Sequence, residues 1–455
     1  MERFLQSAAK PISDGSKESS RCERRQQQQE QNVVLEYEQT GRMHKRLHHL
    51  CTTNVMKSYA LVECLEQDNY LPPSMSRQSY VSDIEFNTEG NLVAFTTSMG
   101  YMNIHAYDSI LSGKRMPPVA AYSLCGKLQA VRWNPLDQLQ VACVAESVGS
   151  VIIFDVRHRQ PESLEKMQVF RTKPGTETHR GLYDVQCKSW KIFACASGGV
   201  YVWDRRAGNL STATLRAPSF AGTMLSLDIT SDEQVLLAGS SSGHIFAWDI
   251  RGGKASSCSA FSSPNNVDQH PLGVISMSTA LQEIPDLRSQ TYTGDLSVTC
   301  VRLNSSGDQL AFGLNKGWSG VINMLNFQEI THIHCPPSLW ELGSPSWLSM
   351  TKLTWLLSLP VVAVASGDLR FLEFSGPGSR HHVSSRNNGC APVVIEMADG
   401  VYSVAAHPSD GCLMVGTQVR CSDFISSSFI QLLYVVQEHT HLVAPIQLVR
   451  IPIPK

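Results

Sequence analysis

The sequence lacks a long uninterrupted apolar run. The apolar stretch from Leu353 to Ala365, for example, contains Pro360 and is far shorter than the roughly 20 residues that a membrane-spanning helix needs. The N-terminal residues are polar and have no apolar core of the kind found in a secretory signal. We therefore expect no membrane insertion, and we expect the protein in the nucleus, the cytoplasm or both.

The chain also has little net charge and no paired cysteine motif. Its 38 Lys and Arg residues nearly balance 40 Asp and Glu residues, giving a net charge of −2, so no overall basic field recruits nucleic acid. None of the 13 cysteines forms a CxxC pair, and Cys143, Cys195 and Cys300 lie in apolar strand-like runs. We expect mostly free thiols that pack as small core residues in a reducing compartment.

Recognisable catalytic and metal-binding patterns are missing as well. The glycine-rich segment 313–320 has a lysine but not the order of a phosphate-binding loop, which favours a hairpin turn. In the segment 332–335, strand alternation places His332 and His334 on one face and Cys335 on the other, which favours a strand with polar outer positions. No GxSxG motif surrounds any serine. We predict no catalytic residue, no metal site and no cofactor.

What the sequence does contain is a repeated strand pattern. Five segments each read as a strand end, a tight turn rich in Pro, Asp, Ser, Asn or Gly, and a second strand of apolar and small residues. They are 86–98, 133–145, 229–241, 303–315 and 406–418. A third strand follows in several units and ends in an aromatic residue and an acidic one. These pairs are Tyr107-Asp108, Phe154-Asp155, Trp203-Asp204 and Trp248-Asp249.

These pairs and their spacing resemble the signature of the WD-repeat family. From Phe154 to Trp203 is 49 positions and from Trp203 to Trp248 is 45, close to the roughly 40 to 45 residues of one WD repeat. The resemblance covers about residues 58–452 and implies an all-β fold, a seven-bladed β-propeller with a disordered or short-helical N-terminal extension. In such a fold Trp203 and Trp248 would lie on third strands, with their rings packed between blades and their acidic neighbours at the strand ends.

The expected blades follow from the repeats. They are 81–124, 128–172, 182–216, 224–261, 298–334, 353–383 and 401–450. A terminal strand such as Tyr59 to Leu65 or His441 to Ile451 is expected to close the ring. The last three blades lack the aromatic-acidic pair, and insertions at 262–297 and 375–400 are expected to form loops.

The N-terminal part differs in composition. Residues 1–32 are predicted to be a disordered polar tail, because they have too little apolar content to offset the entropy of ordering. Residues 33–55 are predicted to be an amphipathic helical segment with Met43, Leu47 and Leu50 on one face, and residues 56–455 the propeller. Two interpretations of the helix are open: it packs on its own propeller or frays in water, or it docks on a partner.

An arginine stands two positions after the acidic residue in three consecutive units, at Arg157, Arg206 and Arg251. This ending resembles the WDxR box of substrate receptors for cullin-4 RING ubiquitin ligases, although Ser242 stands where that family usually has Asp or Glu. The resemblance implies that these arginines and the helical segment dock on the damaged-DNA-binding adaptor subunit. An arginine at this position can also cap a strand end or pair with a neighbouring Asp.

Two hypotheses about function remain. In the first, the chain is a non-catalytic interaction propeller that docks on the cullin-4 adaptor while another face selects a substrate protein for ubiquitination. In the second, it is a general scaffold for a complex unrelated to ubiquitin, in signalling, transcription or RNA processing, and the arginines are structural. Direct DNA recognition is disfavoured by the near-neutral charge.

Overall fold

The structure of the chain is a computed structural model of residues 1–455. It describes residues 52, 56, 59–69, 80–111, 118–124, 126–157, 165–168, 181–251, 267–284, 296–315, 317–327, 329–334, 351–356, 359–374, 382–384, 393–395, 400–417 and 428–437. The predicted tail at 1–32 lies outside these residues and stays a prediction.

The described strands fall into seven sheets. We number them along the chain from the sheet that begins at Val81, and the sheet that also contains the N-terminal strand is numbered last. Sheet 1 contains β2 (Val81–Phe86), β3 (Leu92–Thr97), β4 (Tyr101–Ala106) and β5 (Ala120–Ser123). Sheet 2 contains β6 (Leu128–Asn134), β7 (Asp137–Ala145), β8 (Val148–Asp155) and β9 (Glu165–Gln168). Sheet 3 contains β10 (Leu182–Lys188), β11 (Lys191–Ala196), β12 (Gly199–Asp204), β13 (Ala213–Arg216) and β17 (Val267–Gln269). Sheet 4 contains β14 (Met224–Ile229), β15 (Val235–Ser240), β16 (His244–Asp249) and β18 (Gly273–Ser276).

The remaining sheets are built from the second half of the chain and one N-terminal strand. Sheet 5 contains β19 (Val298–Leu303), β20 (Gln309–Leu314), β21 (Ser319–Asn323), β22 (Ile330–His334) and β26 (His382–Ser384). Sheet 6 contains β23 (Lys352–Trp355), β24 (Val361–Ser366), β25 (Asp368–Glu373) and β27 (Val393–Ile395). Sheet 7 contains β28 (Val401–Ala406), β29 (Cys412–Thr417), β30 (Ser428–Gln437) and β1 (Tyr59–Asn69). Short helical elements lie at α3 (Tyr107–Leu111), η2 (Ser219–Ala221), α4 (Met277–Glu283) and η4 (Met324–Asn326).

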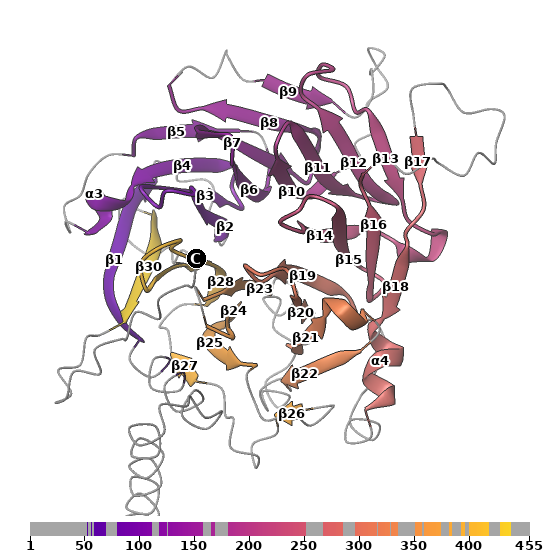
Figure 1. Ribbon diagram of the computed structural model, residues 1–455. Helices are drawn as coiled ribbons and strands as arrows, with labels where there is room; N and C mark the ends of the chain where they lie inside the picture. Colours follow the sequence, from indigo (N-terminus) through magenta and orange to yellow (C-terminus); the bar gives the residue numbers. More distant parts are fainter. Residues whose placement is uncertain are drawn as a thin grey trace, which may run out of the picture.

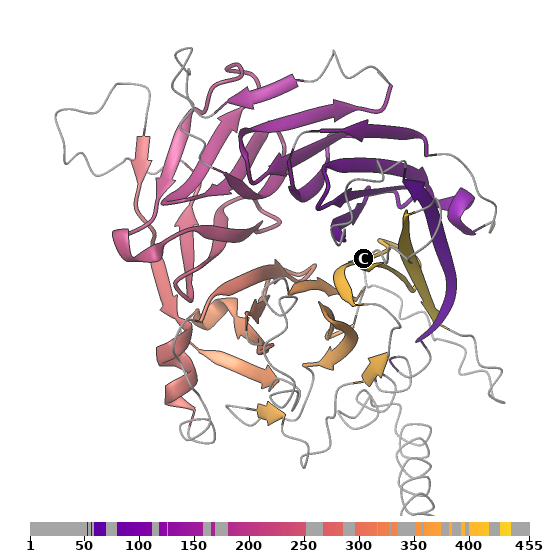
Figure 2. The same cartoon turned by 180° about the vertical axis from the view of Figure 1, so that it is seen from behind.

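The sheets stand around a central axis as the blades of a propeller (Figure 1; Figure 2 shows the other side). The first strands β2, β6, β10, β14, β19, β23 and β28 are innermost, and each contacts the next around a closed ring. Sheet 7 closes the ring because β1 pairs antiparallel with β30. The predictions of an all-β propeller and of closure by a strand that begins at Tyr59 are confirmed, whereas the alternative closing strand at 441–451 lies outside the described residues.

The turn between β2 and β3 illustrates how the sequence sets this arrangement. Asn87 accepts a hydrogen bond from the backbone N of Leu92 on its side-chain oxygen, at 3.0 Å, which closes the turn locally. Gly90 has a φ of +77° and lies against the ring of His407, 2.3 Å from where a Cβ would stand. Only glycine fits both demands, so this turn also fixes the contact between sheets 1 and 7.

Two insertions and one motif pair differ from the sequence prediction. The insertions expected to be loops at 262–297 and 375–400 supply the outer strands β18 and β27, and they also contribute α4, β17 and β26. These strands span only three or four residues at sheet edges, so they need no sustained alternation of apolar residues. The expected strand-end pair Tyr107-Asp108 instead begins α3, where the Tyr107 ring stacks on His407 at a centroid distance of 4.3 Å.

The core lies between the blades. Among the described residues, the buried apolar side chains form seven clusters, and each cluster joins two neighbouring sheets. Trp203 on β12 and Trp248 on β16 are fully buried in two of these clusters, and Asp204 and Asp249 end their strands. The predicted placement of both tryptophans is confirmed. Cys143, Cys195 and Cys300 are buried free thiols, as predicted.

No helix in the described part of the chain is long and apolar enough to cross a membrane. Residues 313–315 and 317–320 belong to the hairpin that β20 and β21 form, as predicted, and 330–334 is strand β22. The expectation of polar outer positions there is wrong for His334, which is buried with its ring edge-on to Phe374, at a centroid distance of 5.1 Å.

Candidate functional site

The turns between the first and second strands of the sheets lie on one side of the ring, which we call the turn face. Hydrogen bonds join such turns in neighbouring sheets: Thr88 N donates to Gln138 Oε1 at 2.9 Å, and Ser189 Oγ donates to Glu233 Oε1 at 2.7 Å. Because successive strands run antiparallel, each third strand also ends on the turn face. The residues that follow the aromatic-acidic pairs therefore belong to this face.

All three predicted docking arginines pair with the acidic residue of their own motif, and two of them do so with the same geometry. Arg251 donates from Nε to Asp249 Oδ1 at 3.0 Å and from Nη2 to Oδ2 at 2.7 Å. Arg206 repeats this geometry with Asp204, at 3.0 and 2.7 Å. The two arginine side chains are 59% and 64% exposed, so one edge of each guanidinium is occupied while the rest faces solvent.

Arg157 is held more firmly. Its Nη1 donates to Asp155 at 3.1 Å, and its Nη2 donates to Asp137 across the neighbouring turn at 2.6 Å. Its side chain is 48% exposed. The interpretation that these arginines pair with a neighbouring Asp therefore describes the free molecule, and Arg157 has the fewest donors to offer a partner.

The arginines also set the protonation of their partners. Hydrogen bonding from Arg251 lowers the pKa of Asp249 to about 2, and hydrogen bonding from Arg206 lowers the pKa of Asp204. Both carboxylates stay ionised at neutral pH. The turn face consequently presents paired charges rather than a net basic patch at these positions.

The predicted contact residues of the helical segment, Met43, Leu47 and Leu50, lie outside the described residues, and their role stays a prediction. Thr52, near the end of the segment, is buried, and so is Met56, the first residue of the part predicted to be the propeller. Met56 packs in the cluster between sheets 6 and 7. The choice between packing on its own propeller and docking on a partner therefore stays open for the segment.

Large apolar side chains are exposed on the turn face beside the arginines. Trp190 lies half exposed in the turn between β10 and β11, and Leu325 in η4 is 92% exposed. Leu136 and Leu272 are exposed in a turn and a connection on the same side. On the opposite face Phe220, in the connection between β13 and β14, is exposed. Aromatic, leucine and arginine side chains together are typical of surfaces that bind proteins.

The first strands carry charged residues into the centre of the ring. Arg132 on β6 lies between Asp83 on β2 and Asp184 on β10, with Nη1 2.5 Å from Asp83 Oδ2 and Nη2 3.0 Å from Asp184 Oδ1. All three residues are buried. The cluster therefore ties sheets 1, 2 and 3 together inside the channel.

Two further cations extend this cluster. Arg302 on β19 places Nη1 3.5 Å from Asp184 Oδ2, and Lys352 on β23 places Nζ 3.8 Å from Asp83 Oδ1. Burial disfavours the charged form of Asp184, but Arg132, Arg302 and Lys352 outweigh burial and lower its pKa to about 2. The channel thus contains ionised groups of both signs.

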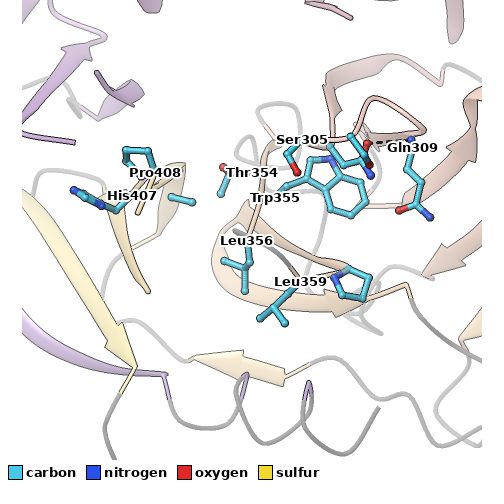
Figure 3. A pocket seen from close by; sticks show the side chains of 12 residues that line it. Ser305, Gln309, Thr354, Trp355, Leu356, Leu359, His407 and Pro408 are labelled. Carbon is cyan, nitrogen blue, oxygen red and sulfur yellow. Dashed lines mark hydrogen bonds between the residues drawn. The ribbon is translucent and has the colours of Figure 1, made fainter. Parts of the chain in front are cut away.

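A groove of about 360 Å³ opens beside the channel, between sheets 5, 6 and 7. Trp355, Leu356 and Leu359 form its apolar part (Figure 3). In Figure 3, Thr354 lies between Trp355 and the His407-Pro408 pair. Thr354, Ala406 and Pro408 line both the groove and the central channel, so the two hollows are continuous.

The ring can be compared with solved structures. The crystal structure of the WD40 β-propeller domain of Doa1 matches this chain with a TM-score of 0.53 and 12% sequence identity, over 85% of this chain and 99% of that one. The chain has a WD40 β-propeller fold. No protein-family model matches the sequence, and no curated protein matches it. The resemblance to WD repeats is confirmed for the fold, and the resemblance to the WDxR box stays a prediction.

The channel charges of this WD40 propeller were not predicted from the sequence. A signal was present, because Asp83, Arg132 and Asp184 each interrupt the apolar run of an innermost strand. A charged residue in a buried strand needs an ionic partner. The three could have been matched with one another once the strands were assigned as innermost. Within the described part of the chain, no group of three or more His, Cys, Asp or Glu side chains is placed to hold a metal ion.

Proposed function

We propose that the protein is a non-catalytic interaction propeller that binds its main partner through the turn face. The observation that carries the proposal is the grouping of exposed apolar side chains and the motif arginines on that one face. Trp190 and Leu325 lie there with Arg206 and Arg251. Interfaces are enriched in aromatic and arginine side chains, and the WD40 fold supports such a role.

We further propose that the partner is the damaged-DNA-binding adaptor of a cullin-4 RING ligase, which would make the chain a substrate receptor. The WDxR resemblance supports this identification. Docking would require Arg206 and Arg251 to exchange or share their carboxylate partners. That exchange has a low cost, because solvent and salt screen exposed ion pairs and they contribute little to stability.

The test is binding of the full-length protein to the purified adaptor at micromolar concentration. Arg206→Ala and Arg251→Ala should each weaken binding about tenfold, since a central interface arginine contributes more than about 1 kcal/mol. Phe220→Ala, on the opposite face, is the matched control and should leave the affinity unchanged. An absence of association by the unsubstituted protein would end the cullin-4 proposal.

The helical segment needs a separate arm of the same experiment. Leu47→Asp combined with Leu50→Asp should weaken adaptor binding at least as much as the arginine changes, because burying such leucines is worth roughly 1.5–3 kcal/mol each. The melting temperature should stay unchanged if the segment docks on the partner. A lowered melting temperature with unchanged binding would instead place the segment on its own propeller.

The second candidate is a general scaffold for a complex unrelated to ubiquitin. The intramolecular pairing of all three motif arginines favours it, because each guanidinium already has an acidic partner. Under this proposal the adaptor does not bind. The unsubstituted chain nevertheless captures other proteins from cells, and Trp190→Ala should abolish their capture. Phe220→Ala again serves as the control for the opposite face.

A further inference from the structure

The central channel ends in a cavity at the turn face. Its volume is about 380 Å³, and all seven innermost strands contribute to its wall. Asn87, Thr88 and Pro408, which belong to turns, also line it, so the cavity opens on the turn face. Water occupies about 30 Å³ per molecule, and the cavity therefore has room for a polar side chain.

The acidic groups of the cavity already have hydrogen-bond donors. Asp228 accepts from the backbone N of Ile229 on Oδ1 and from the backbone N of Leu303 on Oδ2, both at 2.8 Å. Glu85 Oε2 accepts from the backbone N of Trp133 at 2.6 Å. Each of these carboxyl groups thus accepts a hydrogen bond from the backbone, and neither needs a donor from a ligand to satisfy it.

The basic groups have donors to spare. Arg302 donates from Nη1 to the carbonyls of Val301 and Leu227, at 2.9 and 3.2 Å, but its Nη2 and Nε donate to no described residue. The Lys352 ammonium has the 3.8 Å ion pair with Asp83 and no hydrogen bond to a described residue. Both side chains are only partly exposed, at 17% for Arg302 and 18% for Lys352, and such donors gain from a charged acceptor. The vacant hydrogen-bonding capacity of the cavity is therefore that of an anion-binding site.

We propose that this end of the channel binds the carboxylate of an acidic side chain in a partner peptide, with Lys352 and Arg302 as donors. The adjoining groove selects a peptide over a small anion. Thr354, Ala406 and Pro408 line both hollows, and Trp355 in the groove donates from Nε1 to the backbone oxygen of Arg302 at 2.9 Å. An apolar side chain next to the acidic residue fills the groove at Leu356 and Leu359. The inference does not depend on the cullin-4 adaptor.

The experiment uses two soluble peptide libraries and the immobilised full-length protein. The libraries share randomised flanking positions and differ at one fixed position, which is Glu in one and Gln in the other. We expect about tenfold stronger retention of the Glu library, because charge-assisted hydrogen bonds contribute about 1.5–3 kcal/mol. Leu, Ile, Met and Phe should be enriched beside the fixed Glu.

Variants locate the site. Lys352→Gln should reduce retention of the Glu library to the level of the Gln library, whereas Lys352→Arg should preserve it. Thr354→Glu should repel the carboxylate at the shared wall without removing a buried ion pair, and Thr354→Gln is its matched neutral control. Arg251→Gln, outside the channel, should have no effect.

Three results would overturn the proposal. The first is equal retention of both libraries by the unsubstituted protein, and the second is a Glu preference that persists in both Lys352→Gln and Thr354→Glu. The third is binding of inorganic phosphate or free glutamate, measured calorimetrically, without retention of either library. That last result would assign the cavity to a small anion.

Discussion

Arg132 and Arg251 make the same kind of contact in two different surroundings. Arg132 lies in the channel with its side chain 3% exposed and bridges Asp83 and Asp184. Arg251 lies on the turn face with its side chain 59% exposed and pairs with Asp249. Both pairs are close and charge-assisted, so geometry alone does not distinguish them.

Burial distinguishes them. Inside the channel, a charge that loses its partner is not solvated by water, so its loss is costly. The ion pairs there therefore hold the blades together. On the turn face, water compensates a lost partner, and the guanidinium can exchange its carboxylate at little cost. The channel arginine is therefore a structural residue, and the turn-face arginine is free to serve binding.

The largest effect is expected from Arg132→Leu. It leaves the buried carboxylates of Asp83 and Asp184 without their main partner, which should lower the free energy of unfolding by about 3–5 kcal/mol in urea titrations. Adding Asp83→Asn and Asp184→Asn should recover part of the loss, because the uncompensated charge is removed. If Arg132→Leu lowered the free energy of unfolding no more than Arg251→Ala does, burial would not explain the difference between the two arginines.

A similar contrast exists between two tryptophans. Trp248→Ala removes a fully buried ring between sheets 3 and 4 and should cost about 3–5 kcal/mol. Trp190→Ala, the matched control on the turn face, should change stability by about 0.5 kcal/mol or less. Urea unfolding of both variants checks the pair, and equal losses would contradict the assignment of the blade core.

His105 shows what burial does to a basic group that has no acidic partner in the described part of the chain. It is buried on β4, stacks on Phe95 at a centroid distance of 5.7 Å, and its Nε2 has no hydrogen-bond partner among the described atoms. Burial lowers its pKa to about 4 from 6.5, whereas Arg132 stays charged between its two carboxylates.

The lowered pKa of His105 gives stability a pH dependence of known sign. The unfolded chain binds the proton more tightly, so this contribution is complete above pH 6.5 and is lost as the pH falls towards 4. The total is about 3 kcal/mol. Burial raises the pKa of Glu85 to about 7 and gives an opposite slope, so the test compares the unsubstituted protein with His105→Phe. The free energy of unfolding is measured by urea titration between pH 7 and 4.5. If it changes with pH equally in both proteins, His105 does not cause the pH dependence.

The sequence predicted the parts of the fold that repeat. Turn residues and apolar second strands marked the innermost hairpins, and Trp203 and Trp248 marked third strands, because burial between blades demands those residue types. The outer strands β18 and β27 were missed, since three or four residues at a sheet edge carry no periodicity. The channel pairs were missed because partners such as Arg132 and Asp184 meet only after the ring closes.

The candidate site was predicted only in part. The motif arginines were found because they stand at a fixed offset from the strand-end acid, which places them together on the turn face. Their pairing with Asp204 and Asp249 was an open alternative that only side-chain geometry could resolve. Exposed residues such as Trp190 and Leu325 have no sequence signal, because exposure depends on the connections around them.

The smallest effect is expected from the turn-face arginines themselves. Arg206→Ala and Arg251→Ala should each lower the free energy of unfolding only slightly, and the loss should shrink further at high salt, because exposed pairs are screened. Arg157→Ala should cost the most of the three, since it alone also bridges the turn at Asp137. Urea titrations at low and high salt measure these differences.

This measurement decides how any binding defect of these variants is to be understood. If Arg251→Ala leaves stability nearly unchanged and weakens partner binding, the arginine acts at the interface, because the fold that presents it is intact. A loss comparable with that of Arg132→Leu would mean that the Asp249 pair holds the strand end in place. The arginine would then be structural despite its exposure, and burial would no longer separate the two kinds of pair.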